Sequence, residues 1–200
     1  MSKTVELLFD FVSPNAYLVW QPLKDIAART GAKIKVTPVF LGGMHKLTGN
    51  APPFIRDGEV KGKNAYAMLE MNRFIKVHGM DRFTMNPNFP FNSILLQRLL
   101  VAATDDGREM ELIDFFLPHI WENGTNVADA EIVTELLANS EFDAAALLAK
   151  TQDAAIKQRL VDNTSGGVER GAFGIPTFYI GDEMFFGKER LGQIETELQG

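Results

Sequence analysis

Strand patterns occur only near the two ends of this chain, and this distribution limits the folds that it can adopt. Residues 4 to 11 alternate between apolar and polar side chains, with the period of two that a half-buried strand requires. A helical pattern over residues 14–30 follows, and Gly31 ends it. Apolar residues over 34–40 then indicate a second strand, so residues 4–41 predict a β-α-β unit with a parallel strand pair.

The other end of the chain predicts a β-β-α unit. Residues 177–180 and 183–186 have the apolar and aromatic composition of strands, and the Gly181–Asp182 pair between them suits a tight hairpin turn. A last helix is predicted from three apolar residues at helical spacing: Leu191, Ile194 and Leu198.

The middle of the chain shows helical patterns and no convincing strand. Residues 63–163 contain periodic apolar patterns that indicate four or five helices. The sequence therefore predicts an α/β fold, in which a thioredoxin-like domain of β-α-β and β-β-α units is interrupted by an all-helical insertion domain. We place the thioredoxin-like domain at residues 1–44 and 164–200, and the helical insertion domain at residues 45–163.

The composition excludes several classes of function. A net charge of −6, from 20 basic and 26 acidic residues, does not supply the clustered Lys and Arg that binding to nucleic acid needs. No run of eighteen apolar residues occurs, and the N-terminus enters the first strand without the apolar core of a signal peptide. We therefore expect a soluble, cytoplasmic protein that does not contact membranes. The three histidines lack metal-ligand spacing, so no metal site is predicted.

Ser13 is the first candidate for a functional residue, because it stands where a thioredoxin-like chain is expected to carry a reactive cysteine. The segment Asp10–Tyr17 indicates a strand end, Ser13 as a helix N-cap and Pro14 at the first helical position. Free backbone N–H groups and the helix dipole suit an anion or a thiolate there, although an N-cap Ser is also an ordinary structural residue. Because the chain has no cysteine, a sulfur nucleophile would have to arrive on a small molecule such as glutathione.

Five short motifs, in register along nearly the whole chain, carry a resemblance to a known family. They are Asp10–Pro14, Thr48–Pro53, Asn86–Pro90, Gly171–Thr177 and Phe186–Leu191. With these motifs the chain resembles the glutathione-dependent 2-hydroxychromene-2-carboxylate isomerases, which belong with the kappa-class glutathione transferases to the DsbA-like branch of the thioredoxin superfamily. The resemblance implies glutathione as the cofactor, a small aromatic 2-oxo acid or chromene carboxylate as the substrate, and a homodimer.

The resemblance assigns the middle of glutathione to Ser13 and to the loop before the third predicted strand. The Ser13 hydroxyl would hydrogen-bond the glutathione sulfur and stabilise its thiolate. The segment Ile175-Pro176-Thr177 resembles the cis-proline loop of the superfamily, in which Ile175 would pair with the cysteinyl backbone of glutathione. Without the resemblance, Pro176 would be a trans proline that opens a strand.

The resemblance also assigns the two ends of glutathione. Lys188 and Glu189, at the start of the last predicted helix, stand where the family has a small polar residue and an Asp that receive the γ-glutamyl group, so Lys188 departs from the family pattern. Lys63, favoured over Lys61, would meet the glycyl carboxylate, and Asn50 would contact glutathione or the organic substrate. Without the resemblance, Lys188 and Glu189 would belong to a solvated first helical turn. Lys63 would be an isolated surface lysine, and Asn50 would be a turn residue.

Three functions fit these residues. The first is an isomerase of aromatic hydrocarbon catabolism that interconverts 2-hydroxychromene-2-carboxylate, or a polycyclic analogue, and trans-o-hydroxybenzylidenepyruvate by adding and eliminating a glutathione thiolate. The second is a kappa-like glutathione transferase, and the third is a non-catalytic thioredoxin-like binding module. The loop of residues 86–92, before a helix capped by Asn92 or Ser93, would line the aromatic pocket. By resemblance, its residues 89–92 favour the isomerase.

Overall fold

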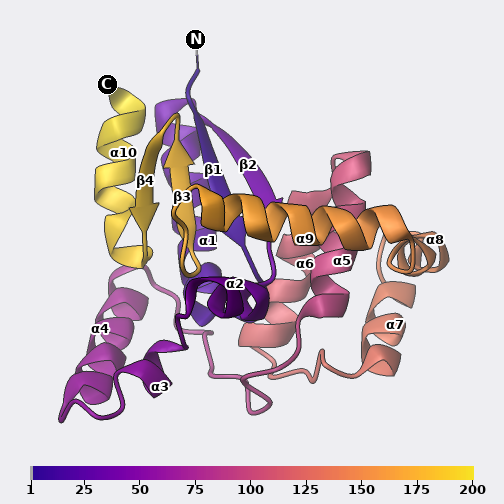
Figure 1. The fold of residues 1–200 in the computed structure, drawn as a ribbon, viewed down its shortest axis with the longest axis horizontal. Helices are drawn as coiled ribbons and strands as arrows, with labels where there is room; N and C mark the ends of the chain where they lie inside the picture. Colours follow the sequence, from indigo (N-terminus) through magenta and orange to yellow (C-terminus); the bar gives the residue numbers. More distant parts are fainter. Residues whose placement is uncertain (1) are drawn as a thin grey trace.

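The computed structural model describes residues 2–200, which form a four-stranded sheet flanked by helices (Figure 1). In chain order the elements are β1 (Thr4–Phe9), α1 (Pro14–Thr30), β2 (Lys33–Pro38), α2 (Leu41–Thr48), α3 (Pro53–Arg56), α4 (Lys63–Val77), α5 (Ile94–Ala103), η1 (Thr104–Asp106), α6 (Glu109–Trp121), α7 (Ala130–Ala138), α8 (Ala144–Lys150), α9 (Ala154–Glu169), β3 (Thr177–Ile180), β4 (Glu183–Phe186), η2 (Lys188–Arg190) and α10 (Leu191–Gln199). Within residues 2–200, no helix has both the length and the apolar character that crossing a membrane requires.

The sheet has the strand order β2-β1-β3-β4. β1 and β2 run parallel, with Val5 opposite Ile34, as the predicted β-α-β unit requires. β3 pairs antiparallel with β1 and with β4, and Ile180 stands opposite Glu183 across the hairpin turn. The predicted thioredoxin-like arrangement of β-α-β and β-β-α units in one α/β sheet is therefore confirmed.

The second strand is shorter than the sequence predicted. β2 ends at Pro38 rather than near residue 40. The Val39 amide still donates to the Phe9 carbonyl of β1 at 3.1 Å, but the two amides that follow it leave the sheet for other acceptors. The Phe40 amide donates to Thr164 Oγ1 at 2.9 Å, and the Leu41 amide donates to Asp10 Oδ2 at 2.7 Å. Both acceptors are remote in sequence, and together they turn the chain into α2.

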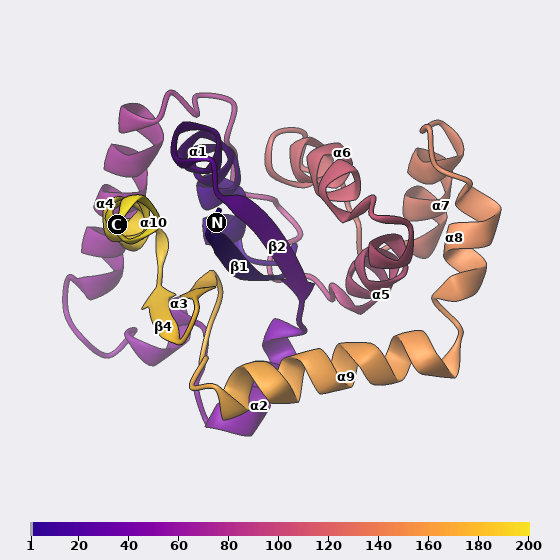
Figure 2. The same ribbon diagram turned by 90° about the horizontal axis from the view of Figure 1, so that it is seen from above.

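Helices cover both faces of the sheet. α1 and α10 lie side by side against one face, and α2 and α9 lie against the other (Figure 2). α5 to α8 form a group beyond β2, while α3 and α4 lie on the opposite side of the molecule, with α4 next to the start of α10. Six helices, α4 to α9, begin within the described residues 63–163, where the sequence indicated four or five. α7 and α8 span only nine and seven residues, too few for periodicity to separate them from their neighbours.

One hydrophobic core joins the sheet to the helices beyond β2. Phe9 and Phe11 are fully buried at the end of β1, with ring centroids 5.0 Å apart, and Phe11 lies 5.9 Å from Phe116 of α6. The indole of Trp121 donates to the Phe11 carbonyl at 3.1 Å. The proposed domain boundaries, at residues 44/45 and 163/164, fall inside α2 and α9, and the division into two domains stays a prediction.

The last helix begins later than predicted. Residues Lys188–Arg190 form the short 3₁₀ turn η2, and α10 starts only at Leu191. Gly187 has a φ of +92°, a region that favours glycine, and its carbonyl accepts the Arg190 amide at 3.2 Å. This tight turn brings Lys188 and Glu189 back toward α4.

Candidate functional site

Ser13 lies at the N-terminus of α1, and its side chain is turned toward the loop that precedes β3. Its amide donates to the Asp10 carbonyl at 3.1 Å, which closes the turn after β1. Its hydroxyl oxygen accepts the Ala16 amide at 3.3 Å, so the predicted N-cap is confirmed. The same hydroxyl donates to the Ile175 carbonyl at 3.3 Å, and the residue is only 4% exposed.

The loop before β3 contacts three other parts of the predicted site. The Ile175–Pro176 peptide bond is cis, as the resemblance implied. The Pro176 carbonyl accepts the Gly187 amide at 3.0 Å, and the Phe173 carbonyl accepts the side-chain amide of Asn50 at 2.7 Å. Within residues 2–200 the Ile175 amide makes no hydrogen bond. A free backbone donor beside Ser13 can pair with the backbone of a peptide ligand.

Lys188 and Glu189 form a pair of opposite charges next to Gly187. The Lys188 side chain is buried, its ammonium lies 5.8 Å from the centre of the Phe74 ring, and it donates to the Glu189 carboxylate. Burial alone would raise the pKa of Glu189, but the hydrogen bond and the charge of Lys188 hold it below its ordinary value. Two opposite charges side by side suit the ammonium and carboxylate of an amino-acid group.

Lys63 lies at a second charged corner, which Asn50 connects to the proline loop. Lys63, the first residue of α4, pairs with Asp57 at 2.9 Å, and Arg56 binds the same carboxylate through two nitrogens at 2.9 and 3.0 Å. Arg56 also donates to the side-chain oxygen of Asn50 at 3.4 Å. The hydrogen bonds from Arg56 and Lys63 hold the pKa of Asp57 far below its ordinary value. Two cations on one carboxylate leave a net positive charge.

Lys61, the alternative to Lys63, is exposed and belongs to no ion pair within residues 2–200.

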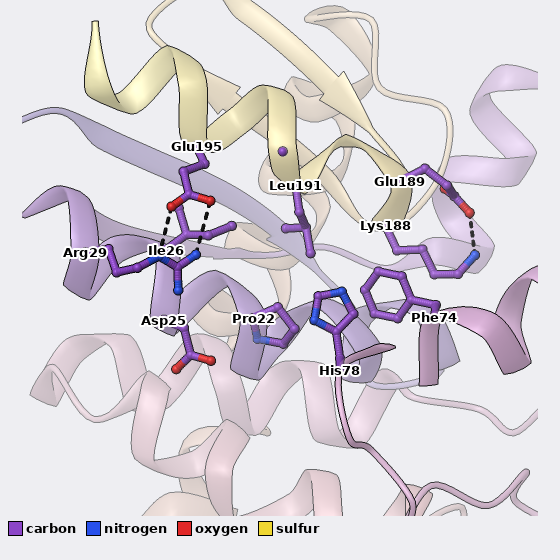
Figure 3. Close-up of a pocket in the computed structure, with 11 residues that line it drawn as sticks. Pro22, Asp25, Ile26, Arg29, Phe74, His78, Lys188, Glu189, Leu191 and Glu195 are labelled. Carbon is purple, nitrogen blue, oxygen red and sulfur yellow. Dashed lines mark hydrogen bonds and ion pairs between the residues drawn. The ribbon is translucent and has the colours of Figure 1, made fainter. Parts of the chain in front are cut away.

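A pocket of about 410 Å³ lies between α1, α4 and α10 (Figure 3). The Lys188–Glu189 pair borders one end, and the ion pair between Arg29 and Glu195 borders the other, with 2.9 Å between Arg29 Nε and the carboxylate. The rings of Phe74 and His78 stand between them, with centroids 4.2 Å apart (Figure 3). The pocket therefore borders the predicted γ-glutamyl residues but does not include Ser13.

The model of the DSBA-like thioredoxin domain family matches residues 4–199. The chain belongs to this DSBA-like family. It is 28% identical over 199 residues to a 2-hydroxychromene-2-carboxylate isomerase of Pseudomonas putida, across 97% of this chain and 93% of that protein. It is 23% identical to glutathione S-transferase kappa 1 of Caenorhabditis elegans, across 98% and 90% of the two chains. A solved structure of a 2-hydroxychromene-2-carboxylate isomerase superposes with a TM-score of 0.83 at 25% identity, over 98% of this chain and 94% of that one. The resemblance is therefore confirmed, and full-length similarity to named isomerases supports an isomerase enzyme.

In this DSBA-like chain, the loop of residues 86–92 contributes the side chain of Phe89 to a group of packed aromatic rings. The Phe89 ring lies 5.8 Å from Phe54 of α3 and 6.0 Å from Trp121. The buried side chain of Asn86 anchors the loop by donating to the carbonyls of Ile120 and Thr125, at 2.9 and 3.0 Å. Of the two predicted caps of α5, the Asn92 side chain accepts the Ile94 amide at 3.0 Å, whereas Ser93 makes no side-chain cap.

Two residues of the DSBA-like site, Arg56 and Asp10, were not predicted to have a functional role from the sequence. Arg56 lies on the one-turn helix α3, and only the fold brings it to the side chain of Asn50 and to the carboxylate that Lys63 also binds. Asp10 is a fully buried carboxylate three residues before Ser13, and burial raises its pKa to about 6. A signal for Asp10 existed, because an acidic residue at the end of an apolar strand is unusual.

Two of the three histidines lie near the candidate site: His78 lines the pocket between α1, α4 and α10, and the charge of Arg56 acts on His45. No group of three or more His, Asp and Glu side chains within residues 2–200 could hold a metal ion. Burial, followed by the charge of Arg56, lowers the pKa of His45 below its ordinary value.

Proposed function

We propose that this chain is a glutathione-dependent isomerase that interconverts 2-hydroxychromene-2-carboxylate, or a polycyclic analogue, and trans-o-hydroxybenzylidenepyruvate. The observation that carries the proposal is the juxtaposition of the Ser13 hydroxyl and the unpaired Ile175 amide in a chain that has no cysteine. This pair can hold a peptide-like thiol but cannot perform disulfide exchange on its own.

The residues around this pair fit glutathione. Ile175 pairs with the cysteinyl backbone, and the sulfur then lies at Ser13. The Glu189 carboxylate receives the γ-glutamyl ammonium, and Lys188 receives the neighbouring carboxylate, which requires their mutual ion pair to open. At the other end, Lys63 and Asn50 bind the glycyl group, and the second cation, Arg56, reinforces the attraction for its carboxylate.

When bound at these residues, glutathione would supply a thiolate for reversible addition to the conjugated double bond of the 2-oxo acid, so that the resulting single bond could rotate before elimination restores the double bond and the thiolate. The chain's own contribution is to keep that sulfur ionised. The Ser13 hydroxyl can turn from the Ile175 carbonyl to the sulfur, and the amides of the first turn of α1 and its dipole favour a negative charge there. Phe89 and Phe54 provide apolar, aromatic surface for the flat ring of the substrate.

The test is an assay of dialysed protein with 2-hydroxychromene-2-carboxylate, with and without glutathione. We expect interconversion only with glutathione, whose concentration does not fall. Formation of a conjugate, with one glutathione consumed for each substrate, would instead identify a kappa-like transferase, in line with the kappa-class relatives. Glutathione binding without any reaction of the substrate would identify a binding module.

We further propose a cytoplasmic homodimer. Reduced glutathione is abundant in the cytosol, which suits a cofactor that must be a free thiol. The surface of α3 and α4 supports the dimer, because it exposes several large apolar side chains, namely Phe54, Ile55, Tyr66, Met68 and Leu69. Sedimentation equilibrium should give twice the mass of the chain, and an Ile55→Glu, Tyr66→Glu variant should sediment as a monomer. A monomeric wild-type protein would contradict this assembly.

A further inference from the structure

Asp10 is a buried carboxylate that the proposed reaction does not use. It follows β1, is fully buried, and has no cationic side chain among the groups that set its pKa. Its Oδ1 accepts the Val12 amide at 3.1 Å, and its Oδ2 accepts the Leu41 amide at 2.7 Å. A buried charge without a counter-ion is costly, so a fold that holds one here needs the hydrogen bonds that the charge makes.

The two amides belong to two different walls of the proposed site. Val12 precedes Ser13 in the turn at the N-terminus of α1, and Leu41 is the first residue of α2, the helix that leads to Asn50. The Asp10 carboxylate therefore connects the turn that carries Ser13, which would contact the sulfur, to the start of α2, which leads to Asn50. The position at the start of α2 also lets the helix dipole stabilise the negative charge.

The other polar groups around Asp10 are neutral. The Ser93 hydroxyl before α5 is buried beside the carboxyl and favours its ionised form. Gln97 of α5 is fully buried, and its side chain donates to the carbonyls of Phe9 and Val39 at 2.7 and 2.6 Å. Gln97 thus holds the backbone on either side of Asp10, and among the groups described around it the Asp10 carboxyl is the one that titrates.

We propose that Asp10 is a positioning residue that clamps the Ser13 turn to the start of α2 only while its carboxyl is ionised. A carboxylate offers two acceptor oxygens, whereas the protonated acid carries a hydrogen on one of them and cannot accept both amides equally well. Since burial raises the pKa of Asp10 to about 6, the clamp weakens as the pH falls from 7 to 5. The predicted effect on ligand binding rests on the proposed function, but the clamp itself does not.

The sign of the effect separates this role from a merely structural one. A raised pKa means that the folded state binds the proton more tightly than the unfolded chain, so this group makes the fold more stable as the pH falls through 6. Ligand binding should change in the opposite direction and weaken over the same range. A loss of binding caused by general unfolding would show both properties falling together.

The probe for binding is S-methylglutathione, because its sulfur cannot ionise and the pH dependence then comes from the protein. Glu189 and Asp57 have lowered pKa values and stay ionised over the pH range of this test, and a His45→Gln, His78→Gln background removes the two histidines near the proposed ligand. We expect calorimetry to show affinity falling on the order of tenfold from pH 7.5 to 5, as for the loss of one charge-assisted hydrogen bond. Asp10→Asn should bind at every pH as the wild type does at pH 5, and the exposed Asp162→Asn should behave as the wild type.

NMR of the wild-type protein tests the clamp without any ligand. We expect the Asp10 carboxyl carbon to titrate near pH 6, and the amides of Val12 and Leu41 to shift with the same midpoint. Titration of Asp10 below pH 5, or amides that do not follow it, would overturn the proposal. So would an Asp10→Asn variant that keeps the pH dependence of the wild type. If S-methylglutathione does not bind at any pH, the proposed function fails, and the amide titrations still decide the clamp.

Discussion

Replacing Ser13 with Ala should lower turnover far more than it lowers stability or glutathione affinity. In the folded protein the hydroxyl makes two hydrogen bonds of 3.3 Å, one from the Ala16 amide and one to the Ile175 carbonyl. Loss of an N-cap typically costs ~1 kcal/mol and loss of a neutral hydrogen bond ~0.5–1.5 kcal/mol. Because both bonds are long, we expect a total loss of unfolding free energy of about 1–2 kcal/mol.

The effect on the reaction should be larger, because the hydroxyl matters most when the sulfur carries a negative charge. Removing one donor to such an anion typically lowers the rate ~10²–10³-fold, or about 3–4 kcal/mol. Glutathione affinity should change less, since it comes mainly from the charged ends and from the backbone of Ile175. The pKa of the bound thiol should rise.

Four measurements on wild type and Ser13→Ala check this prediction: urea unfolding, calorimetric titration with glutathione, turnover of 2-hydroxychromene-2-carboxylate, and thiolate absorbance against pH. Ser165→Ala is a matched control, because that hydroxyl also bonds backbone carbonyls, but on the outer side of α9. An unshifted thiol titration with intact turnover would refute the reasoning. Ser13 would then be a helix cap alone, and attention would move to Asn15 and to the amides of the same turn.

Three further predictions concern the ends of glutathione, the pH dependence and the packing. Glu189→Gln and Lys63→Ala should each raise the half-saturating glutathione concentration roughly fivefold, which corresponds to about 1 kcal/mol of binding free energy. The effect is modest because both side chains are 51% exposed and solvent screens their charges. Unchanged values in both variants would mean that these positions are misassigned. The wild-type free energy of unfolding should fall by roughly 2.5 kcal/mol from pH 4 to pH 7 through the ionisation of Asp10, whose pKa rises from 3.8 to about 6 on folding, and urea titrations of the Asp10→Asn variant should lack this loss. In α9, Gly167→Ala should destabilise the fold by ~1–3 kcal/mol, because the added Cβ would lie 2.9 Å from the Leu8 side chain of β1. The neighbouring Gly166→Ala places its Cβ in open space and should stabilise the fold by ~0.5–1 kcal/mol. Equal effects of the two substitutions in urea unfolding would contradict the packing described.

The strands were predictable because their signals are local. The period-two pattern of β1 and the Gly181–Asp182 turn lie within a few residues of the structures that they specify. The end of β2 was not predictable from local signals. The side chains that accept the Phe40 and Leu41 amides belong to Thr164 and Asp10, and Thr164 is more than a hundred residues away.

The candidate site divides in the same way. Ser13 and the Ile175–Pro176 loop could be found from short motifs, since an N-cap and a proline leave marks in the sequence. Lys188 has the pattern of a solvated first turn, yet it is buried against Phe74, because the 3₁₀ turn redirects it. Arg56 is one charged residue among many, and its place beside Asn50 depends on how α3 follows α2.

The most direct test of the proposed site is the structure of this chain with glutathione bound. We expect the sulfur within hydrogen-bond distance of Ser13 Oγ, the cysteinyl backbone paired with Ile175, the γ-glutamyl group at Lys188 and Glu189, and the glycyl carboxylate near Lys63. Glutathione bound with its sulfur out of reach of Ser13, for example wholly within the pocket between α1, α4 and α10, would contradict the site and the mechanism that we derive from it.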